Sequence, residues 1–314
     1  MHPVARAVTG LGAAGVLGVG YASLVERNAF VLRRFRVPVL PPGHPTVRVV
    51  HLTDLHLMPG QRRKVAWVAD LARLRPDLVV NTGDNISHPE SIPVALEAFR
   101  AFRGVPGVFV LGSNDYFAPT PKNPLLYLAP KMPTVAGKAR RLPTEDLVKG
   151  MLDLGWTDLT NARATLDVGG SPFEFLGVDD PHLSYDRYGL VEGPADPAVA
   201  LTVGVTHAPY QRILDAMARD GAGLLIAGHT HGGQLCLPGI GALVTNCDLD
   251  TGRAKGLSRW WPGAGRARGG ADAVIPPDAA WLEVSAGLGT SPYAPVRFAC
   301  RPEATLLTLV PRAG

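Results

Sequence analysis

One pattern recurs along this chain and limits what it can fold into: short apolar runs typical of buried strands end in residues that bind metal ions. Amphipathic stretches at 62–73 and 92–103 separate the first of these runs and predict helices. This alternation predicts an α/β sheet, in which polar residues that follow parallel strands meet at one edge. The predicted strands and the polar residues after them are 47–52 with Asp54 and His56, 77–80 with Asp84, 108–111 with Asn114 and Asp115, 201–205 with His207, and 223–227 with His229 and His231.

The composition is that of a folded protein with one large domain. Of the 314 residues, 46% are hydrophobic and 18% are charged, which allows a sizeable core. The formal net charge of +4 is small and its charges are scattered, so we expect no nucleic acid partner. Cys236, Cys247 and Cys300 show no CxxC spacing, so they predict neither a disulfide framework nor a zinc–thiolate site.

The N-terminal segment has a different character from the rest. Residues 7–25 carry no charged side chain, and a helix of this length can cross a bilayer. We expect residues 1–28 to form a transmembrane anchor or a signal segment, and residues 29–314 to form a globular domain. The lack of a sharp cleavage site favours an uncleaved, single-pass anchor, whereas a buried N-terminal helix is the alternative. Arginines after the segment outnumber Arg6 before it, which by the positive-inside rule would keep the domain in the cytoplasm. Because most of these arginines belong to a predicted strand at 30–40, the membrane face stays open.

The polar residues include the parts of a site for two divalent ions. Asp54 and His56 alternate at the end of a strand and therefore point the same way. Asp84 follows a glycine, which lets the backbone bend tightly and leaves one carboxyl oxygen free for each ion. His229 and His231 alternate around a threonine. Each motif alone is compatible with a cap or a turn, but together, each at a strand end, they predict a two-metal hydrolytic site.

The order of the motifs along the chain is informative in itself. It reads Asp54-x-His56, Gly83-Asp84, Gly112-x-Asn114-Asp115, His207 and Gly228-His229-x-His231. This order resembles the calcineurin-like metallophosphoesterase superfamily, from about residue 30 to the C-terminus. The stretches 228–234 and 287–291 resemble more specifically a membrane-anchored or exported bacterial branch, which includes YkuE-like and UDP-2,3-diacylglucosamine pyrophosphatase-like enzymes.

The resemblance implies a fold and a ligand set. The fold is a four-layer α-β-β-α sandwich, the metallo-dependent phosphatase fold, with one N-terminal membrane helix. One ion would be held by Asp54, His56, Asp84 and His231, and the other by Asp84, an asparagine, His207 and His229. Asp84 would bridge the ions, and a hydroxide between them would attack phosphorus in line. Such ligands suit manganese, iron and zinc, of which we favour manganese.

One loop departs from the family pattern. The family reads Gly-Asn-His-Asp where this chain reads Gly112-Ser113-Asn114-Asp115. Either the loop is shifted by one residue, so that Asn114 reaches the second ion and Asp115 takes the place of the histidine, or Ser113 is a poor ligand and Asn114 replaces the histidine. We prefer the first interpretation because an amide oxygen is the better ligand for a hard divalent ion. Catalytic roles are therefore predicted for Asp84, Asn114 and Asp115.

The missing histidine bears on the substrate. Its assistance to the leaving group would contribute ~10²–10⁴-fold in rate, so we expect slow turnover or a leaving group that needs little protonation, such as a phosphate. The implied function is hydrolysis of a phosphodiester or pyrophosphate bond, on a lipid-linked or cell-envelope compound at the bacterial cell membrane. The alternative is a non-catalytic metal-binding scaffold or sensor of the same fold. The oligomeric state is not determined by the sequence.

A proline-rich, basic stretch at 117–142 follows the altered loop. It predicts a long loop, which either covers the site or is an ordinary surface loop. Tyr116, just before it, is a candidate for stacking on a base or a sugar.

Overall fold

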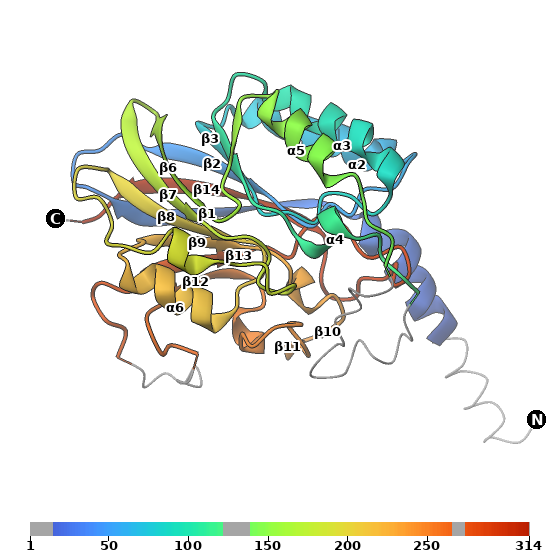
Figure 1. The fold of residues 1–314 in the computed structure, drawn as a ribbon. Helices are drawn as coiled ribbons and strands as arrows, with labels where there is room; N and C mark the ends of the chain where they lie inside the picture. Colours follow the sequence, from blue (N-terminus) through green and yellow to red (C-terminus); the bar gives the residue numbers. More distant parts are fainter. Residues whose placement is uncertain (1–14, 122–138, 266–273, 314) are drawn as a thin grey trace, which may run out of the picture.

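The chain builds two six-stranded sheets that pack face to face in the computed structural model, which describes residues 15–121, 139–265 and 274–313 (Figure 1). A separate ribbon pairs β10 (Cys236–Leu237) with β11 (Gly241–Ala242). The first sheet has the order β1 (Val31–Leu40), β14 (Glu303–Pro311), β2 (Val47–Leu52), β3 (Leu78–Asn81), β4 (Gly107–Phe109) and β5 (Trp156–Asp158). The second has the order β12 (Gly256–Trp260), β13 (Ala280–Val284), β9 (Leu224–Ala227), β8 (Leu201–Thr206), β7 (Ser171–Gly177) and β6 (Ala162–Val168).

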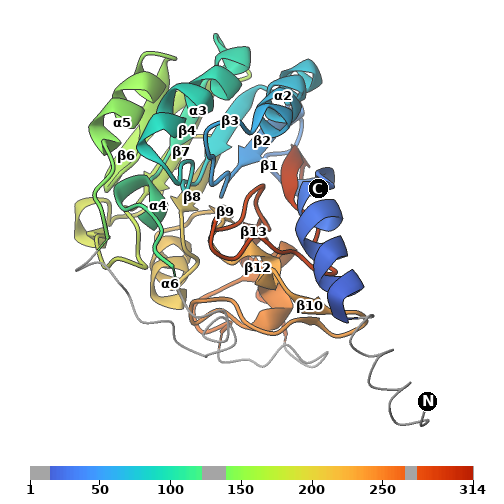
Figure 2. The same cartoon turned by 90° about the vertical axis from the view of Figure 1, so that its right-hand side faces the viewer.

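Helices cover the outer faces of the two sheets, so the predicted sandwich of two mixed sheets is confirmed (Figures 1 and 2). Short 3-10 turns extend α2 and α3 close to the ends predicted for them. The helices on the first sheet are α2 (Arg62–Asp70), α3 (Ile92–Phe99) and α5 (Thr144–Leu152), and the helix on the second sheet is α6 (Gln211–Arg219).

Strand β2 shows why the central strands carry apolar residues on both faces. Val47 and Val49 pack into the core between the two sheets, while Val50 and Leu52 pack against the helices on the other side. Successive side chains of a strand point to opposite faces, so a strand covered on both faces needs apolar residues at both.

The pairing of the strands gathers their carboxyl ends at one edge of each sheet. In the first sheet β2, β3 and β4 run parallel. In the second sheet β7, β8, β9 and β13 run parallel. The loops that leave these ends therefore meet, as the strand pattern predicted.

Strand β14 was not predicted, although it is central to the first sheet. It lies between β1 and β2, parallel to β1 and antiparallel to β2. Its partners are more than 250 residues away in sequence, so no local pattern could identify its place.

The N-terminal segment reaches the edge of the site region. Residues 15–20 are α-helical, and a π-helical turn and a 3-10 turn continue to Asn28. Glu26 is buried and accepts a hydrogen bond from the backbone N–H of Cys300 at 2.6 Å. Within the described ranges no helix is long and apolar enough to span a membrane. Residues 1–14 of the predicted anchor and 122–138 of the predicted long loop lie outside these ranges.

Candidate metal centre

The loops after β2, β3, β8 and β9 bring most of the predicted ligands together. Six of these side chains are buried, each with 9% or less of its surface exposed. Five of the six have positive φ angles, between 41° and 67°. Left-handed backbone is uncommon outside glycine, and such strain concentrates at functional sites. The six are Asp54 and His56 after β2, Asp84 after β3, His207 after β8, and His229 and His231 after β9; all but His207 have the positive angle.

Two overlapping sets of ligand atoms converge in this cluster. Asp54, His56 and His231 offer one atom each, all within 4.8 Å of one another. Asp54, Asp84 and His207 form a second set by the same measure. Two cations that share carboxylate ligands need such an arrangement.

The carboxyl group of Asp84 approaches imidazole rings of both sets. Its Oδ2 is 3.4 Å from Nε2 of His56 and 3.7 Å from Nε2 of His207. The backbone N–H and the side-chain amide of Asn114 donate hydrogen bonds to the two carboxyl oxygens, each at 2.7 Å. Asn114 therefore reaches the cluster, which both interpretations of the altered loop allow. A half-turn of its amide would present the oxygen there instead of the nitrogen.

Partners outside the cluster orient the imidazole rings. His207 donates from Nδ1 to the carbonyl oxygen of Thr82 at 2.7 Å, which directs Nε2 toward Asp84. Nδ1 of His56 lies 3.2 Å from the hydroxyl of Ser87. Rings held in this way by a second hydrogen bond are characteristic of metal-binding histidines.

The polar atoms inside the cluster lack the partners that a site complete without an ion would have. Nε2 of His56 faces Nε2 of His231 at 3.2 Å, and Nε2 of His207 faces Nδ1 of His229 at 3.3 Å. Oδ1 of Asp54 is buried and accepts no hydrogen bond from the described residues. Lone pairs and a carboxylate oxygen directed at a common space are what divalent cations bind, so these residues fit a metal pair.

Burial and neighbouring charges prepare the ligands for cations. Burial lowers the pKa of His56, and it lowers the pKa values of His229 and His231 well below the usual range, so all three rings are neutral at pH 7. Burial acts to raise the pKa of Asp84, but His207, His56 and the hydrogen bonds from Asn114 outweigh it and lower that pKa.

His207 and Asp54 shift in the other direction. Burial acts to lower the pKa of His207, but Asp84, Asp180 and Asp54 outweigh it and raise the pKa to about 9. Burial raises the pKa of Asp54, more than the nearby imidazoles lower it. A bound metal ion would favour the deprotonated form of each group.

Glycine permits the close approach of two of these loops. A Cβ atom on Gly112 would lie 2.3 Å from Oδ1 of Asp84 and 2.7 Å from the ring of His207. The backbone of Gly112 is extended, with φ −110°, so only the lack of a side chain is needed here. Any larger residue would displace the carboxylate of Asp84, which approaches imidazole rings of both ligand sets.

Asp115, predicted to be catalytic, is engaged with the backbone. Its Oδ1 accepts from the N–H of Asn85 at 2.8 Å, and its Oδ2 accepts from the N–H of Gly112 at 3.1 Å. The side chain is fully buried, and burial raises its pKa to about 7. These contacts hold the loop that carries Asn114, which favours a positioning role for Asp115 over a direct part in catalysis.

Three residues beside the cluster are not among the predicted site residues. Arg297 is fully buried among backbone carbonyls, with one guanidinium nitrogen 3.4 Å from Nδ1 of His231. The ring of His182 lies 4.6 Å from that of His229, and Asp180 is fully buried near His207. Asp180 and His182 follow strand β7, where the strand-end pattern allows residues that line the site, although a turn is the preferred interpretation. Arg297 has no such signal.

Comparisons with known proteins agree with this arrangement. The calcineurin-like phosphoesterase family matches residues 47–233. The chain is 26% identical over 248 residues to a transmembrane protein with metallophosphoesterase domain from Bos taurus, which covers 73% of this chain and 50% of that protein. It thus spans about half the length of this relative.

Two bacterial proteins are also similar. The chain is 24% identical over 314 residues to the uncharacterized metallophosphoesterase YkuE of Bacillus subtilis, with 95% of this chain and 93% of that protein covered. It is 24% identical over 231 residues to the phosphodiesterase YaeI of Escherichia coli, with 71% and 75% covered. The family match spans more than half of the chain and contains every cluster residue from Asp54 to His231. The chain therefore belongs to the calcineurin-like phosphoesterase family and is a metallophosphoesterase.

Proposed function

We propose that this protein hydrolyses phosphodiester or pyrophosphate bonds with the help of two divalent cations. The observation that carries the proposal is the position of Asp84, whose Oδ2 lies within 3.7 Å of imidazole nitrogens from both ligand sets. When bound, a pair of cations at such a carboxylate lowers the pKa of a water molecule and neutralises charge on the phosphoryl oxygens.

Each residue has a defined task in this proposal. Asp54, His56, Asp84 and His231 hold one cation, and Asp84, Asn114, His207 and His229 hold the other. The hydrogen bonds of His56 and His207 to Ser87 and Thr82 keep their ring nitrogens directed inward. Asp115 positions the loop that carries Asn114 through its bonds to Gly112 and Asn85.

The altered loop shapes the expected substrate. Neither Asn114 nor the fully engaged Asp115 replaces the family histidine as a proton donor to the leaving group. A leaving group of low basicity, such as a phosphate or a nitrophenolate, needs no such donor. We therefore favour pyrophosphates and aryl esters over alkyl monoesters, with manganese as the favoured ion.

We also propose a single-pass attachment to the bacterial cell membrane through residues 1–28, and a lipid-linked or cell-envelope substrate. The support is chemical: Val16, Leu17 and Leu24 are apolar, and 73–74% of the surface of each is exposed. Large apolar side chains in water mark an interaction with a membrane or a protein. One relative is named a transmembrane protein, and two are bacterial.

The experiment measures metal content and turnover on the same preparations. The full chain, purified without chelator, is assayed by elemental analysis and by hydrolysis of bis-p-nitrophenyl phosphate and of an aryl pyrophosphate with added manganese. Asp84→Asn is compared with Asp278→Asn, which alters an exposed aspartate away from the cluster. We expect about two ions per chain, and a loss of roughly 10³-fold or more in kcat/KM in Asp84→Asn only.

The outcomes separate the proposal from its rival. Bound metal without turnover of either compound would indicate a non-catalytic metal-binding scaffold. Absence of metal from the wild-type protein would contradict both.

A further inference from the structure

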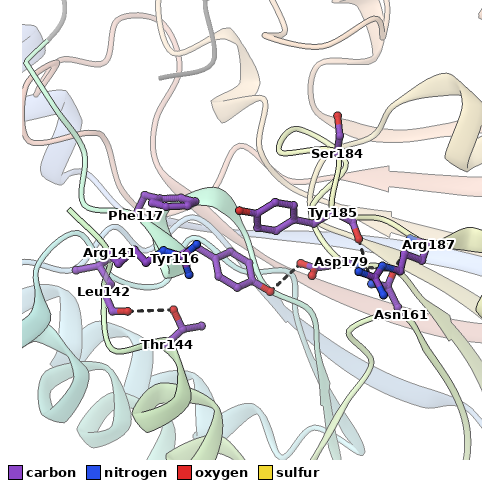
Figure 3. A pocket seen from close by; sticks show the side chains of 10 residues that line it. All are labelled: Tyr116, Phe117, Arg141, Leu142, Thr144, Asn161, Asp179, Ser184, Tyr185 and Arg187. Carbon is purple, nitrogen blue, oxygen red and sulfur yellow. Dashed lines mark hydrogen bonds between the residues drawn. The ribbon is translucent and has the colours of Figure 1, made fainter. Parts of the chain in front are cut away.

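A pocket of about 440 Å³ lies between the segments that follow β4 and β7 (Figure 3). One wall comes from the loop after β4 and includes Tyr116, Phe117 and Arg141. The facing wall comes from the loop after β7 and includes Tyr185 and Arg187. Figure 3 shows the three aromatic rings gathered around the same space.

Both walls lead directly from the proposed metal ligands. Tyr116 shares the single helical turn α4 (Ser113–Tyr116) with Asn114, which bonds to Asp84. On the facing wall, Tyr185 lies three residues after His182, whose ring is 4.6 Å from that of His229. A phosphoryl group held at the metal centre would therefore project one of its substituents toward this pocket.

The aromatic rings are held in fixed positions. The hydroxyl of Tyr116 donates a hydrogen bond to Oδ1 of Asp179 at 2.9 Å. The rings of Tyr116 and Tyr185 meet edge to face, with centroids 5.4 Å apart. Aromatic side chains locked in this way bind planar groups at a low cost in conformational entropy.

The charged residues of the pocket are mainly cationic. Arg141 lies over the ring of Phe117 at 5.6 Å, and Arg187 is exposed on the facing wall. Neither guanidinium has an ion-pair partner among the described residues. The single carboxylate, Asp179, is engaged by the Tyr116 hydroxyl and by the N–H of Asp180. These two arginines therefore lack an anionic partner, which an additional negative charge on the substrate would supply.

We propose that this pocket receives the leaving group of the substrate and selects one that contains a planar ring and carries an additional negative charge. The inference rests on the proposed hydrolysis. In that reaction water adds its oxygen to phosphorus and releases one proton. The bond from phosphorus to the leaving oxygen breaks, with its electron pair on that oxygen. The pocket would bind the departing half, whereas the metal centre would bind the phosphoryl group.

A pair of chromogenic diesters tests the selection. Methyl 4-nitrophenyl phosphate and methyl 3-carboxy-4-nitrophenyl phosphate release similar nitrophenolates, but only the second leaving group carries a carboxylate. We expect the wild-type protein to prefer the carboxylated diester by roughly tenfold in kcat/KM, and the preference to fall as salt is added. The preference should decrease several-fold in Arg187→Gln and Arg141→Gln, and should persist in Arg219→Gln, an exposed arginine on α6.

Binding of the leaving group alone tests the pocket without any turnover. We expect 5-hydroxy-2-nitrobenzoate to bind more tightly than 4-nitrophenol by equilibrium dialysis, and Arg187→Gln to abolish the difference. Tyr185→Leu should weaken binding of both compounds roughly fivefold or more.

The two assays fail separately. If neither diester is hydrolysed, the proposed hydrolysis is wrong, and the dialysis still decides whether the pocket binds. If the two nitrophenols bind equally, or if the arginine variants match the Arg219 control, the pocket does not select an anion and the inference is overturned.

Discussion

Two buried groups of histidines and carboxylates lie in the same sandwich and differ in the atoms that their ring nitrogens face. His51 on β2 and Glu283 on β13 join the two sheets, with Nδ1 and Oε2 2.7 Å apart and both side chains fully buried. The other nitrogen of His51 is 2.8 Å from the hydroxyl of Thr82. Both ring nitrogens thus face oxygen atoms of the protein.

At the metal centre, nitrogen faces nitrogen. The pairs are His56 with His231 at 3.2 Å and His207 with His229 at 3.3 Å. Each ring nitrogen of His51 already has an oxygen partner, although Oε1 of Glu283 accepts no hydrogen bond from the described residues, so we expect this group to stabilise the fold without any ion. The metal centre needs a cation between its nitrogens, so we expect it to serve function at some cost in stability.

The largest effect should come from replacing one histidine in each of the two groups. His51→Leu removes the partner of a buried carboxylate and should lower the free energy of unfolding by about 3–5 kcal/mol, while the metal content stays unchanged. His229→Leu removes one of two facing nitrogens, so we expect it to reduce metal content and leave the stability of the metal-free protein within about 1 kcal/mol of wild type. Denaturant unfolding with elemental analysis measures both, and equal destabilisation by the two substitutions would remove the distinction.

Metal binding should stabilise the folded protein through the metal centre and not through the His51 group. At a free ion concentration 1,000 times the dissociation constant, the gain is about 4 kcal/mol. Binding must displace the proton that the raised pKa of His207, about 9, keeps on its ring, so affinity should increase as the pH rises toward that value. Thermal unfolding with manganese or with chelator at pH 6.5 and 8.5 tests this, with His229→Leu as the control that should lose the response. A melting temperature insensitive to chelator would contradict the cation requirement.

A smaller effect should follow from placing an extra atom against the carboxylate of Asp84. Gly112→Ala places a methyl group against Asp84 and should reduce kcat/KM by roughly 10–100-fold, a range typical of displaced metal ligands. Gly189→Ala is the matched control, because nothing lies within 4 Å of its added atom. If the two variants have the same activity, the position of Asp84 does not depend on the close approach of these loops.

The smallest effect concerns Lys64, which tethers the ligand loop from α2. Its ammonium group donates to the carbonyl oxygen of Leu55 at 2.6 Å, and burial lowers its pKa to about 7. Between pH 7 and the unfolded value of 10.5 the unfolded chain binds the extra proton, so stability should rise with pH in this window. The slope should be about 1 kcal/mol per pH unit smaller in Lys64→Met. Lys149→Met, at an exposed lysine, should keep the wild-type slope; the idea fails if both variants follow the same curve.

Much of the fold and of the candidate site follows from local patterns. The run 47–52 carries apolar residues on both faces, as a strand covered on two sides requires. It forms β2, in a sheet that is packed on both faces. Asp54 and His56 follow it directly. Both have left-handed backbone and not the extended backbone that the alternation assumed, yet their side chains lie within reach of His231. Such features can be predicted locally because strand ends and their loops depend on neighbours in sequence.

Other features depend on contacts between distant segments, which no local pattern encodes. The sequence predicted a catalytic role for Asp115. In the folded protein its carboxyl group accepts hydrogen bonds from the N–H groups of Asn85 and Gly112. Arg297 lies beside His231, 66 residues away in the chain, because the loop before β14 folds back over the site. The pocket has walls from two different sheets.

The sequence by itself determined the order of the strands along the chain, the residues at their carboxyl ends and therefore the chemistry of the site. Only the tertiary structure decided which nitrogens face each other, which carboxylate lies between the ligand sets, and where the leaving-group pocket opens. The physical reason is that side-chain type and alternation are local properties, whereas burial and the pairing of polar atoms are set when the two sheets pack.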